Sequence, residues 1–258
     1  MGRLIFLGTG DPLNDERAQT CLALPQADGT TILFDTSSGT ILLRQLRAAG
    51  IGLASIRHIF VSHRHFDHVG GLAPLLVALT AVPESNVTIH ALPETTQALH
   101  DILTATIPGV EGWLGPRLHW HTLANGTAVP LDGLSVTPFA VEHFMETCGF
   151  RLVRGQSAAV FTADTRPCEG VSNAVRGAEL LIHEAYSTDR DADAAHRFGH
   201  STAADAARVA RDAGVQRLVL THFRSSTFAD PAALAAEAGA IFGGPIEAAS
   251  DLQAIDWP

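Results

Sequence analysis

Residues 57–68 read Arg-His-Ile-Phe-Val-Ser-His-Arg-His-Phe-Asp-His, and the two halves of this stretch differ in character. The first half, which ends at Ser62, has the length and apolar content of a buried β-strand. The second half places three imidazoles and one carboxylate within six residues. An apolar core could not hold all of them, because several would stay unsatisfied or charged there.

The second half therefore predicts a loop that leads from a strand into a helix. On such a loop, alternate side chains can turn toward one point while the next pair turns toward a neighbouring point. His63 and His65 are predicted to bind one metal ion, and Asp67 and His68 a second, because imidazoles and carboxylates are common metal ligands. The alternative is a solvated loop that is rich in histidine by chance, and further candidate ligands argue against it.

Three such candidates each stand at the end of a predicted strand. His143 follows LSVTPFAVE, Asp164 follows AAVFTA, and His222 follows RLVLT. A single histidine in such a place is usually a hydrogen-bonded surface residue. Together with the first cluster, however, these residues make a set of five histidines and two aspartates. That set divides into two groups of three ligands that share one carboxylate, and Asp164 is the candidate bridge.

The composition supports metal chemistry and excludes several other mechanisms. The chain has 258 residues, of which 46% are hydrophobic and 17% charged, as in a folded globular protein. It contains 13 histidines and no lysine, so mechanisms that need a lysine, such as Schiff-base formation or a P-loop, are excluded. The net charge of -10, without a basic run, disfavours broad binding to nucleic acid.

The cysteines and the apolar segments predict where the protein resides. Three cysteines without a C-x-x-C pair fit reduced thiols better than a disulfide framework. Residues 1–10 contain no signal-peptide core, and the apolar stretch over residues 72–82 is too short to span a bilayer. We therefore expect a cytoplasmic protein without membrane contact.

The pattern of elements predicts an α/β fold of two similar halves, each a small sheet with helices, in one domain over residues 1–258. The expected architecture is a four-layer αββα sandwich with two mixed sheets flanked by helices. The predicted helices include one that begins at Ser37 or Ser38 and one over residues 202–213 with Thr202 as its cap and Gly214 as its stop. Predicted strands cover residues 3–7, 21–24, 30–34, 57–62, 87–92, 118–123, 134–141, 148–154, 158–163, 179–184 and 217–221.

The order H-x-H-x-D-H, then His, Asp and His, resembles the metallo-β-lactamase fold superfamily. This resemblance spans nearly the whole chain and implies the αββα fold and a binuclear site with two divalent metal ions, zinc in the first place and manganese or iron as alternatives. It implies that His63, His65 and His143 hold the first metal. Asp67, His68 and His222 would hold the second, and Asp164 would bridge both.

Four further segments are similar to the ribonuclease Z-like branch of this superfamily: LGTG at 7–10, FTADTRP at 161–167, HEA at 183–185 and GHST at 199–202. In that branch the histidine that matches His200 is a catalytic proton donor. The acid that matches Glu184 orients it. Asp67 would hold or accept the proton of the attacking water.

Ribonuclease Z itself carries a long arm that clamps transfer RNA, between the segments that match His143 and Asp164. In this sequence a tight hairpin with its turn at Arg154-Gly155-Gln156 is expected there. The resemblance is therefore to a branch member without the arm, for which nucleic acid is an improbable partner and a homodimer one expected state.

The function expected is that of a binuclear phosphodiesterase, in which a metal-bridging hydroxide attacks a small anionic substrate. One alternative is a hydrolase of lactones or carboxylic esters on the same site, with an apolar pocket lined by Phe144, Met145, Phe198, Phe223 or Phe228. The other alternative is a ribonuclease Z-type endonuclease at the 3′ end of transfer RNA. A metal-binding protein without catalysis is disfavoured because His200 and all seven ligands are present.

Overall fold

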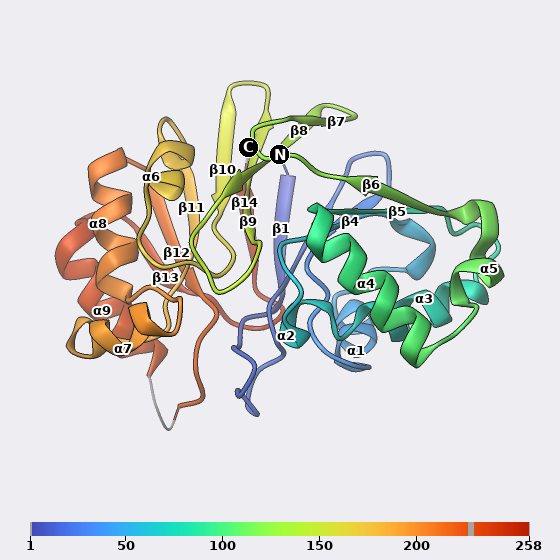
Figure 1. Ribbon diagram of the computed structural model, residues 1–258. Helices are drawn as coiled ribbons and strands as arrows, with labels where there is room; N and C mark the ends of the chain where they lie inside the picture. The colour runs from blue at the N-terminus through green and yellow to red at the C-terminus, as the bar shows by residue number, and fades with distance from the viewer. Residues whose placement is uncertain (1, 227–229, 258) are drawn as a thin grey trace. The chain divides into compact units, whose positions relative to one another are not determined.

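Two seven-stranded mixed β-sheets contain the strands of the residues that the structure describes (Figure 1). The computed structural model describes residues 2–226 and 230–257. Contacts divide the chain into two units, which we call unit 1 (residues up to Pro12, Arg17–Leu123 and Ser250–Trp257) and unit 2 (Leu13–Glu16 and Ala124–Ala249). The expected α/β class with two mixed sheets and flanking helices is confirmed. A single domain over residues 1–258 stays a prediction.

The sheet of unit 1 has the strand order β14-β1-β2-β3-β4-β5-β6. Strands β14, β1, β2 and β3 pair antiparallel, and β3 to β6 pair parallel. The parallel part uses helical crossovers, as such pairing requires. The strands are β1 (Gly2–Gly8), β2 (Cys21–Pro25), β3 (Thr31–Phe34), β4 (Ile56–Val61), β5 (Val87–Ala91), β6 (Leu118–Thr122) and β14 (Ala254–Trp257).

Helices of unit 1 pack on one face of this sheet. Alternate strand residues, such as Ile59 and Val61 on β4, share one hydrophobic core with Leu42 and Leu46 of the first helix. Every second residue of a strand points to the same face of the sheet, and every third or fourth residue of a helix lies on the same side of the helix. These two faces pack against each other. The helices are α1 (Ile41–Ala48), α2 (Phe66–Val69), α3 (Leu72–Thr80), α4 (Pro93–Thr106) and α5 (Val110–Leu114), with 3-10 turns at Leu53–Ser55 and Gly115–Arg117.

Three histidines form a hydrogen-bonded row across β4, β5 and β6. His90 is 3% exposed, and its two ring nitrogens lie 3.0 Å from His58 Nδ1 and 2.9 Å from His121 Nδ1. The His90 ring also stacks on Phe60, with 4.2 Å between the centroids. Burial, and then the two neighbouring imidazoles, lower the pKa of His90 to about 3. This row therefore holds a neutral imidazole inside the unit.

The sheet of unit 2 has the strand order β13-β12-β11-β10-β9-β8-β7. Strands β10 to β13 pair parallel, and β7 to β10 pair antiparallel. The strands are β7 (Val129–Leu131), β8 (Leu134–Ala140), β9 (Cys148–Arg154), β10 (Ser157–Phe161), β11 (Leu180–Glu184), β12 (Arg217–Thr221) and β13 (Ile246–Ala248).

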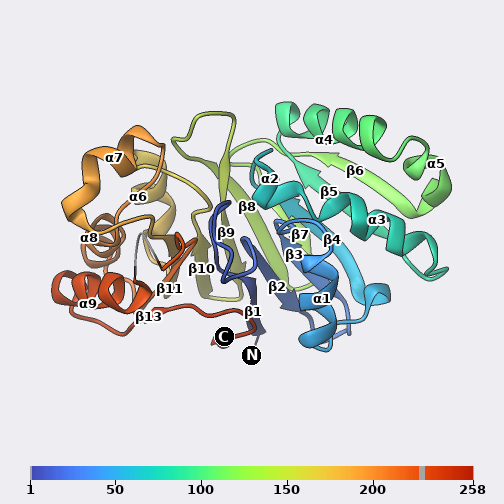
Figure 2. The ribbon, with the colours of Figure 1, turned by 90° about the horizontal axis from the view of Figure 1, so that it is seen from below.

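Helices of unit 2 cover one face of its sheet through small side chains. The core joins Leu218 and Leu220 of β12 to a stripe of alanines that includes Ala203 and Ala210. Alanine lets a helix approach a sheet closely, and Figure 2 shows the last two helices of the unit side by side. The helices are α6 (Glu169–Val175), α7 (Ala192–Arg197), α8 (Ala203–Ala213) and α9 (Pro231–Phe242), with a 3-10 turn at Asp189–Asp191.

The ends of α8 agree with the sequence, and the start of α1 does not. Thr202 caps α8 in a reciprocal pair with Asp205, and Gly214 ends it with a φ of 66°. For α1 the expected cap at Ser37 or Ser38 is wrong, because the helix begins after Thr40 without a side-chain cap. The Ser38 hydroxyl instead donates to Gln19 Oε1 at 2.5 Å. Among the described helices, none is long and apolar enough to cross a membrane.

Candidate metal and acid site

In unit 1 the candidate ligands sit where two parallel strands end. β3 and β4 are neighbours, so the residues that follow them lie at the same edge of the sheet. Asp35 comes directly after β3 with a φ of 60°, a left-handed conformation that is uncommon outside glycine. The loop from Ser62 to His65 follows β4 and runs into α2.

The Asp35 carboxylate organises that loop. It accepts hydrogen bonds from the Ser62 amide at 2.8 Å, the Ser62 hydroxyl at 2.9 Å and His68 Nδ1 at 2.7 Å. Burial raises the pKa of Asp35, and the charge and hydrogen bond of His68 oppose that rise. Because His68 donates from Nδ1, the Nε2 atom of a neutral ring has the lone pair that a metal needs. A carboxylate behind a ligating imidazole is the usual support in metal sites.

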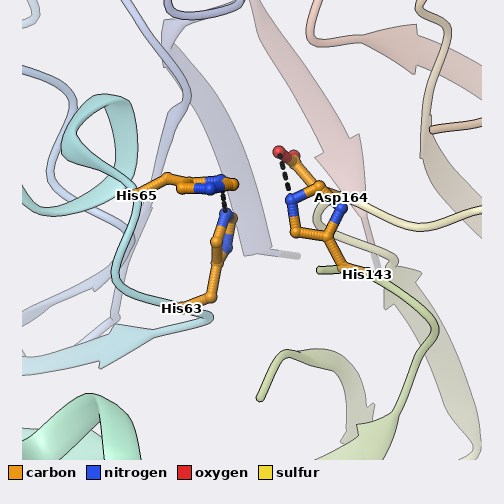
Figure 3. A group of neighbouring side chains, drawn as sticks. All are labelled: His63, His65, His143 and Asp164. Carbon is orange, nitrogen blue, oxygen red and sulfur yellow. Dashed lines mark hydrogen bonds and ion pairs between the residues drawn. The ribbon is translucent and has the colours of Figure 1, made fainter. Parts of the chain in front are cut away.

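The four predicted ligands of unit 1 lie close together. His63 Nε2 is 3.0 Å from His65 Nδ1, and the two rings meet edge to face at an interplanar angle of 76° (Figure 3). The centroids of the His63 and His68 rings are 4.1 Å apart, and Asp67 Oδ2 lies 3.2 Å from His68 Nε2. The side chains of His63, His65, Asp67 and His68 thus lie side by side, and their division between two metal ions stays a prediction.

In unit 2 three of the candidates stand at the ends of three neighbouring parallel strands, whereas His143 follows the antiparallel strand β8. Asp164 follows β10, Glu184 ends β11 and His222 follows β12, so the three stand at one edge of the sheet. Two of the turns are strained, because Ala163 has a φ of 52° and His222 a φ of 58°. The strand register thus aligns residues that are far apart in the sequence.

Asp164 lies next to two imidazoles of its unit. Its Oδ2 atom is 3.9 Å from His143 Nε2 and 3.4 Å from His222 Nε2. The dashed line between Asp164 and His143 in Figure 3 marks the first of these contacts. His143 Nδ1 donates to the Gly199 carbonyl at 2.8 Å, and a carbonyl only accepts, so in a neutral ring Nε2 carries a lone pair. The lone pair on His143 Nε2 faces the negatively charged Oδ2 of Asp164, and the two repel each other unless a cation lies between them. These donors therefore fit a divalent metal ion.

A glycine is required beside His143. Gly199 has a φ of 74°, and a Cβ added there would lie 2.7 Å from His143 Nδ1. The backbone therefore approaches the ring closely enough for its carbonyl to bind Nδ1, which any side chain would prevent.

His200 and Glu184 form a hydrogen-bonded pair. His200 Nδ1 lies 3.1 Å from both carboxylate oxygens of Glu184, which also accepts the Thr165 amide at 2.5 Å. Burial raises the pKa of Glu184 to about 7, against the opposing effect of His200. Ligand atoms of Asp164, Glu184 and His200 lie within 4.8 Å of one another. The pair can thus hold a proton next to the Asp164 carboxylate.

Two residues that the sequence did not single out support His200. The Tyr186 ring lies parallel to the His200 ring, at an interplanar angle of 2° and a centroid distance of 4.5 Å. Asp205 accepts from His196 Nε2 at 2.7 Å while it caps α8, which ties α7 to α8 on both sides of His200. Tyr186 could have been found from its position directly after the HEA segment. For Asp205, the sequence indicates only a role in capping α8 and not its contact with His196.

The phenylalanines expected to line an apolar pocket do not all behave alike. Phe144 is 59% exposed and Phe198 is 48% exposed, whereas Phe223 is fully buried in the core of unit 2. Met145 is half-buried. Phe228 lies outside the described residues. The expectation that Phe223 lines a pocket is therefore wrong, because its side chain belongs to the hydrophobic core of unit 2.

Comparison with known proteins decides the family. The Beta-lactamase superfamily domain matches residues 30–223, which is most of the chain. The chain belongs to the metallo-β-lactamase superfamily. Relatives named ribonuclease Z are 29% identical: that of Haloferax volcanii over 99% of this chain and 95% of its own, and that of Myxococcus xanthus over 99% and 98%. The superfamily member described here is thus related to ribonuclease Z over its full length.

Solved structures of this superfamily share the fold. The metallo-β-lactamase fold protein YhfI from Bacillus subtilis superposes with a TM-score of 0.84 at 20% identity, over 99% of this chain and 100% of that one. A diphosphatase of the PhnP family gives 0.77 at 19% identity, over 100% and 98%. Zn²⁺-bound PqqB from Methylobacterium extorquens gives 0.77 at 19% identity, over 98% and 99%. The expected metallo-β-lactamase fold is confirmed.

The expected enzyme class follows from the family and from the clusters described above. The chain is a metal-dependent hydrolase of this superfamily, and its histidine and aspartate clusters are consistent with a binuclear metal site. The assignment of individual residues to each metal stays a prediction.

The expected short hairpin between His143 and Asp164 is confirmed. β9 and β10 pair with Arg154 opposite Ser157, so only Gly155 and Gln156 form the turn, with Gly155 at a φ of 59°. The alignment with the Haloferax relative runs over 310 positions, against 258 residues in this chain, a difference of 52. At least that many positions of the alignment have no residue in this chain.

Proposed function

We propose that the protein is a binuclear phosphodiesterase that acts on a small anionic ester. The observation that carries this proposal is the His200–Glu184 pair, placed within 4.8 Å of Asp164 in a metal-dependent hydrolase of this family. We assign His63, His65 and His143 to one metal and Asp67, His68 and His222 to the other. Asp164 would bridge the two, and a likeness in fold to Zn²⁺-bound PqqB favours zinc.

Two bound divalent ions would lower the pKa of water and offset the negative charge that grows on the phosphoryl oxygens. Asp67 is proposed to orient the attacking water and to take its proton. The support for this role is its place beside His68, whose ring is fixed by the Asp35 carboxylate.

His200 is proposed to protonate the leaving alkoxide. An imidazole suits this role, because its ordinary pKa of about 6.5 allows it to hold and release a proton near neutral pH. Glu184 accepts a hydrogen bond from Nδ1, which fixes the ring and leaves Nε2 for the leaving group. The parallel Tyr186 ring restrains the same imidazole from its face.

A small substrate fits this chain better than transfer RNA. The two-residue turn between β9 and β10 and the net charge of -10 both disfavour a large polyanion. The endonuclease is nevertheless retained as a second candidate, because full-length relatives are named ribonuclease Z. A lactone or ester hydrolase is the third, favoured by the exposed Phe144 and Phe198. We also expect a cytoplasmic location, and a homodimer is the oligomer that the family resemblance suggests.

A paired assay tests these candidates. The metal-loaded protein is given bis(p-nitrophenyl) phosphate, a lactone panel and a transfer-RNA precursor with a 3′ extension, and its metal content is measured. We expect two metal ions per chain and turnover of the phosphodiester. Turnover of lactones without any of the phosphodiester would overturn the proposal, and specific cleavage of the precursor would favour the endonuclease.

A further inference from the structure

We propose that Arg224 binds the phosphoryl group of the substrate and selects anionic esters over neutral ones. This inference rests on the proposed function and adds a substrate-binding residue that lies outside the metal ligands and the His200–Glu184 pair. It begins from the position of the Arg224 guanidinium, whose carbon lies 4.6 Å from the centroid of the Tyr186 ring.

Tyr186 connects this cation to the proposed acid. The same ring lies parallel to the His200 ring at 4.5 Å, so Arg224 is two ring contacts away from the proton donor. Tyr186 is the only tyrosine of the chain. A guanidinium on an aromatic face keeps its donors in its own plane for hydrogen bonding while the ring limits its motion. The Tyr186 ring thus contacts both the Arg224 guanidinium and the His200 imidazole.

The backbone that carries Arg224 is held on both sides. Asn14 donates from its amide nitrogen to the Phe223 carbonyl at 2.9 Å, and the Phe223 side chain is fully buried. On the other side, the Ser226 amide and hydroxyl donate to Glu16 at 3.2 Å and 2.6 Å. These contacts come from the short segment Leu13–Glu16, which belongs to the same unit. The backbone on either side of Arg224 is therefore held in place.

The chemistry of the group points to phosphate. A guanidinium has five donors in a planar fork that matches two oxygens of a phosphoryl group. A neutral ester or lactone carries no charge for it to bind. His222, whose Nε2 lies 3.4 Å from Asp164 Oδ2, precedes Arg224 by two residues in the chain. An anionic diester would therefore gain from Arg224 an interaction that a neutral ester lacks.

The test compares substitutions at Arg224 with one at a surface arginine. R224Q and R224K are prepared with R211Q as the control, because Arg211 pairs with Asp212 on the exposed side of α8. KM and kcat are measured on bis(p-nitrophenyl) phosphate and on p-nitrophenyl acetate. Binding of inorganic phosphate to each loaded protein is measured by calorimetry, together with metal content and melting temperature.

For R224Q we expect phosphate affinity and kcat/KM on the phosphodiester to fall about 10- to 100-fold, the range for a hydrogen bond to a charged group. Metal content, melting temperature and any turnover of the neutral ester should stay unchanged. R224K should lose less phosphate affinity and less kcat/KM than R224Q, because lysine keeps the positive charge but lacks the planar set of guanidinium donors. R211Q should behave as the wild type.

Y186F and Y186A separate the ring from the hydroxyl. Since the ring face holds Arg224, Y186F should bind phosphate as the wild type does and Y186A should bind it less well. Phosphate affinity of R224Q within twofold of the wild type would overturn the inference, and so would an equal loss on the neutral ester. If the wild type binds phosphate but does not hydrolyse the diester, the proposed function is contradicted. The phosphate affinity of R224Q relative to the wild type then still decides whether Arg224 binds the phosphoryl group.

Discussion

The two units arrange their candidate ligands in different ways. Unit 1 takes four candidate ligands from one run, residues 63–68, which spans a loop and the start of α2, and supports them with Asp35, which follows the neighbouring strand β3. Unit 2 takes its candidates from the ends of several strands, with His143, Asp164 and His222 far apart in the sequence. A loop can be rebuilt without moving a sheet, but unit 2 depends on the register of three parallel strands. Substitutions near the candidate ligands should therefore impair metal binding more in unit 2 than in unit 1.

Asp164→Ala is expected to have the largest effect, because it removes the carboxylate that lies near both His143 and His222. We expect activity to fall by at least about 10³-fold and metal content to drop, since truncating a ligand leaves two imidazoles without their charged partner. Metal analysis after dialysis and initial rates check this. Asp212→Ala on α8 is the control, and a variant that keeps both metals would show that Asp164 is not a bridge.

His200→Ala should come next, with a loss of kcat of about 10²- to 10⁴-fold, the usual range for a positioned acid. Metal content should not change, because the proposed role is proton transfer. Glu184→Gln should have a smaller effect of the same kind, since it weakens only the orientation of His200. Loss of a metal from the His200 variant would reassign this residue as a ligand.

Asp35→Asn tests the support in unit 1. The amide can accept only through one oxygen, so the bonds to Ser62 and His68 cannot all persist. We expect metal affinity to fall about 10- to 100-fold, as is usual for a carboxylate behind a ligating imidazole. Competition with a chromophoric chelator measures it. Asp28→Asn, an exposed aspartate of the same unit that binds Thr30, is the control and should keep full affinity.

The His90 row should give the smallest effect. The pKa of His90 is about 3 in the folded protein and about 6.5 when unfolded, so the unfolded chain binds the proton first as pH falls. Stability is thus present above pH 6.5 and is lost on acidification, by about 2 kcal/mol at pH 5.

Urea unfolding of the metal-free protein at pH 7 and pH 5 measures this loss, and His90→Gln should reduce it. The exposed His119, which binds Asn86 on the same sheet, provides the control His119→Gln. In unit 2, burial lowers the pKa of His183 to about 4, so part of the acid sensitivity should remain in the His90 variant. An unchanged difference between the two pH values would contradict the assignment to His90.

The sequence was most informative where local chemistry decides the structure. The 63–68 cluster, the strand ends at Asp164 and His222, and the two ends of α8 follow from residue type and spacing alone. The start of α1 does not, because Ser38 finds a partner in Gln19, which a local pattern cannot show. Tyr186 and Arg224 meet through the alignment of β11 and β12, and Asp205 reaches His196 across two helices. Contacts of this kind depend on tertiary structure.

The left-handed residues at the strand ends have a consequence for attempts to improve the protein. Ala163 adopts a φ of 52° directly before Asp164, in a region where a Cβ costs about 1 kcal/mol. Glycine there would relieve the strain, and a selection for heat resistance should favour it. The same change would loosen the turn that aims Asp164. Selection for thermal stability alone would therefore choose substitutions that weaken the enzyme, so a useful screen must measure both properties together.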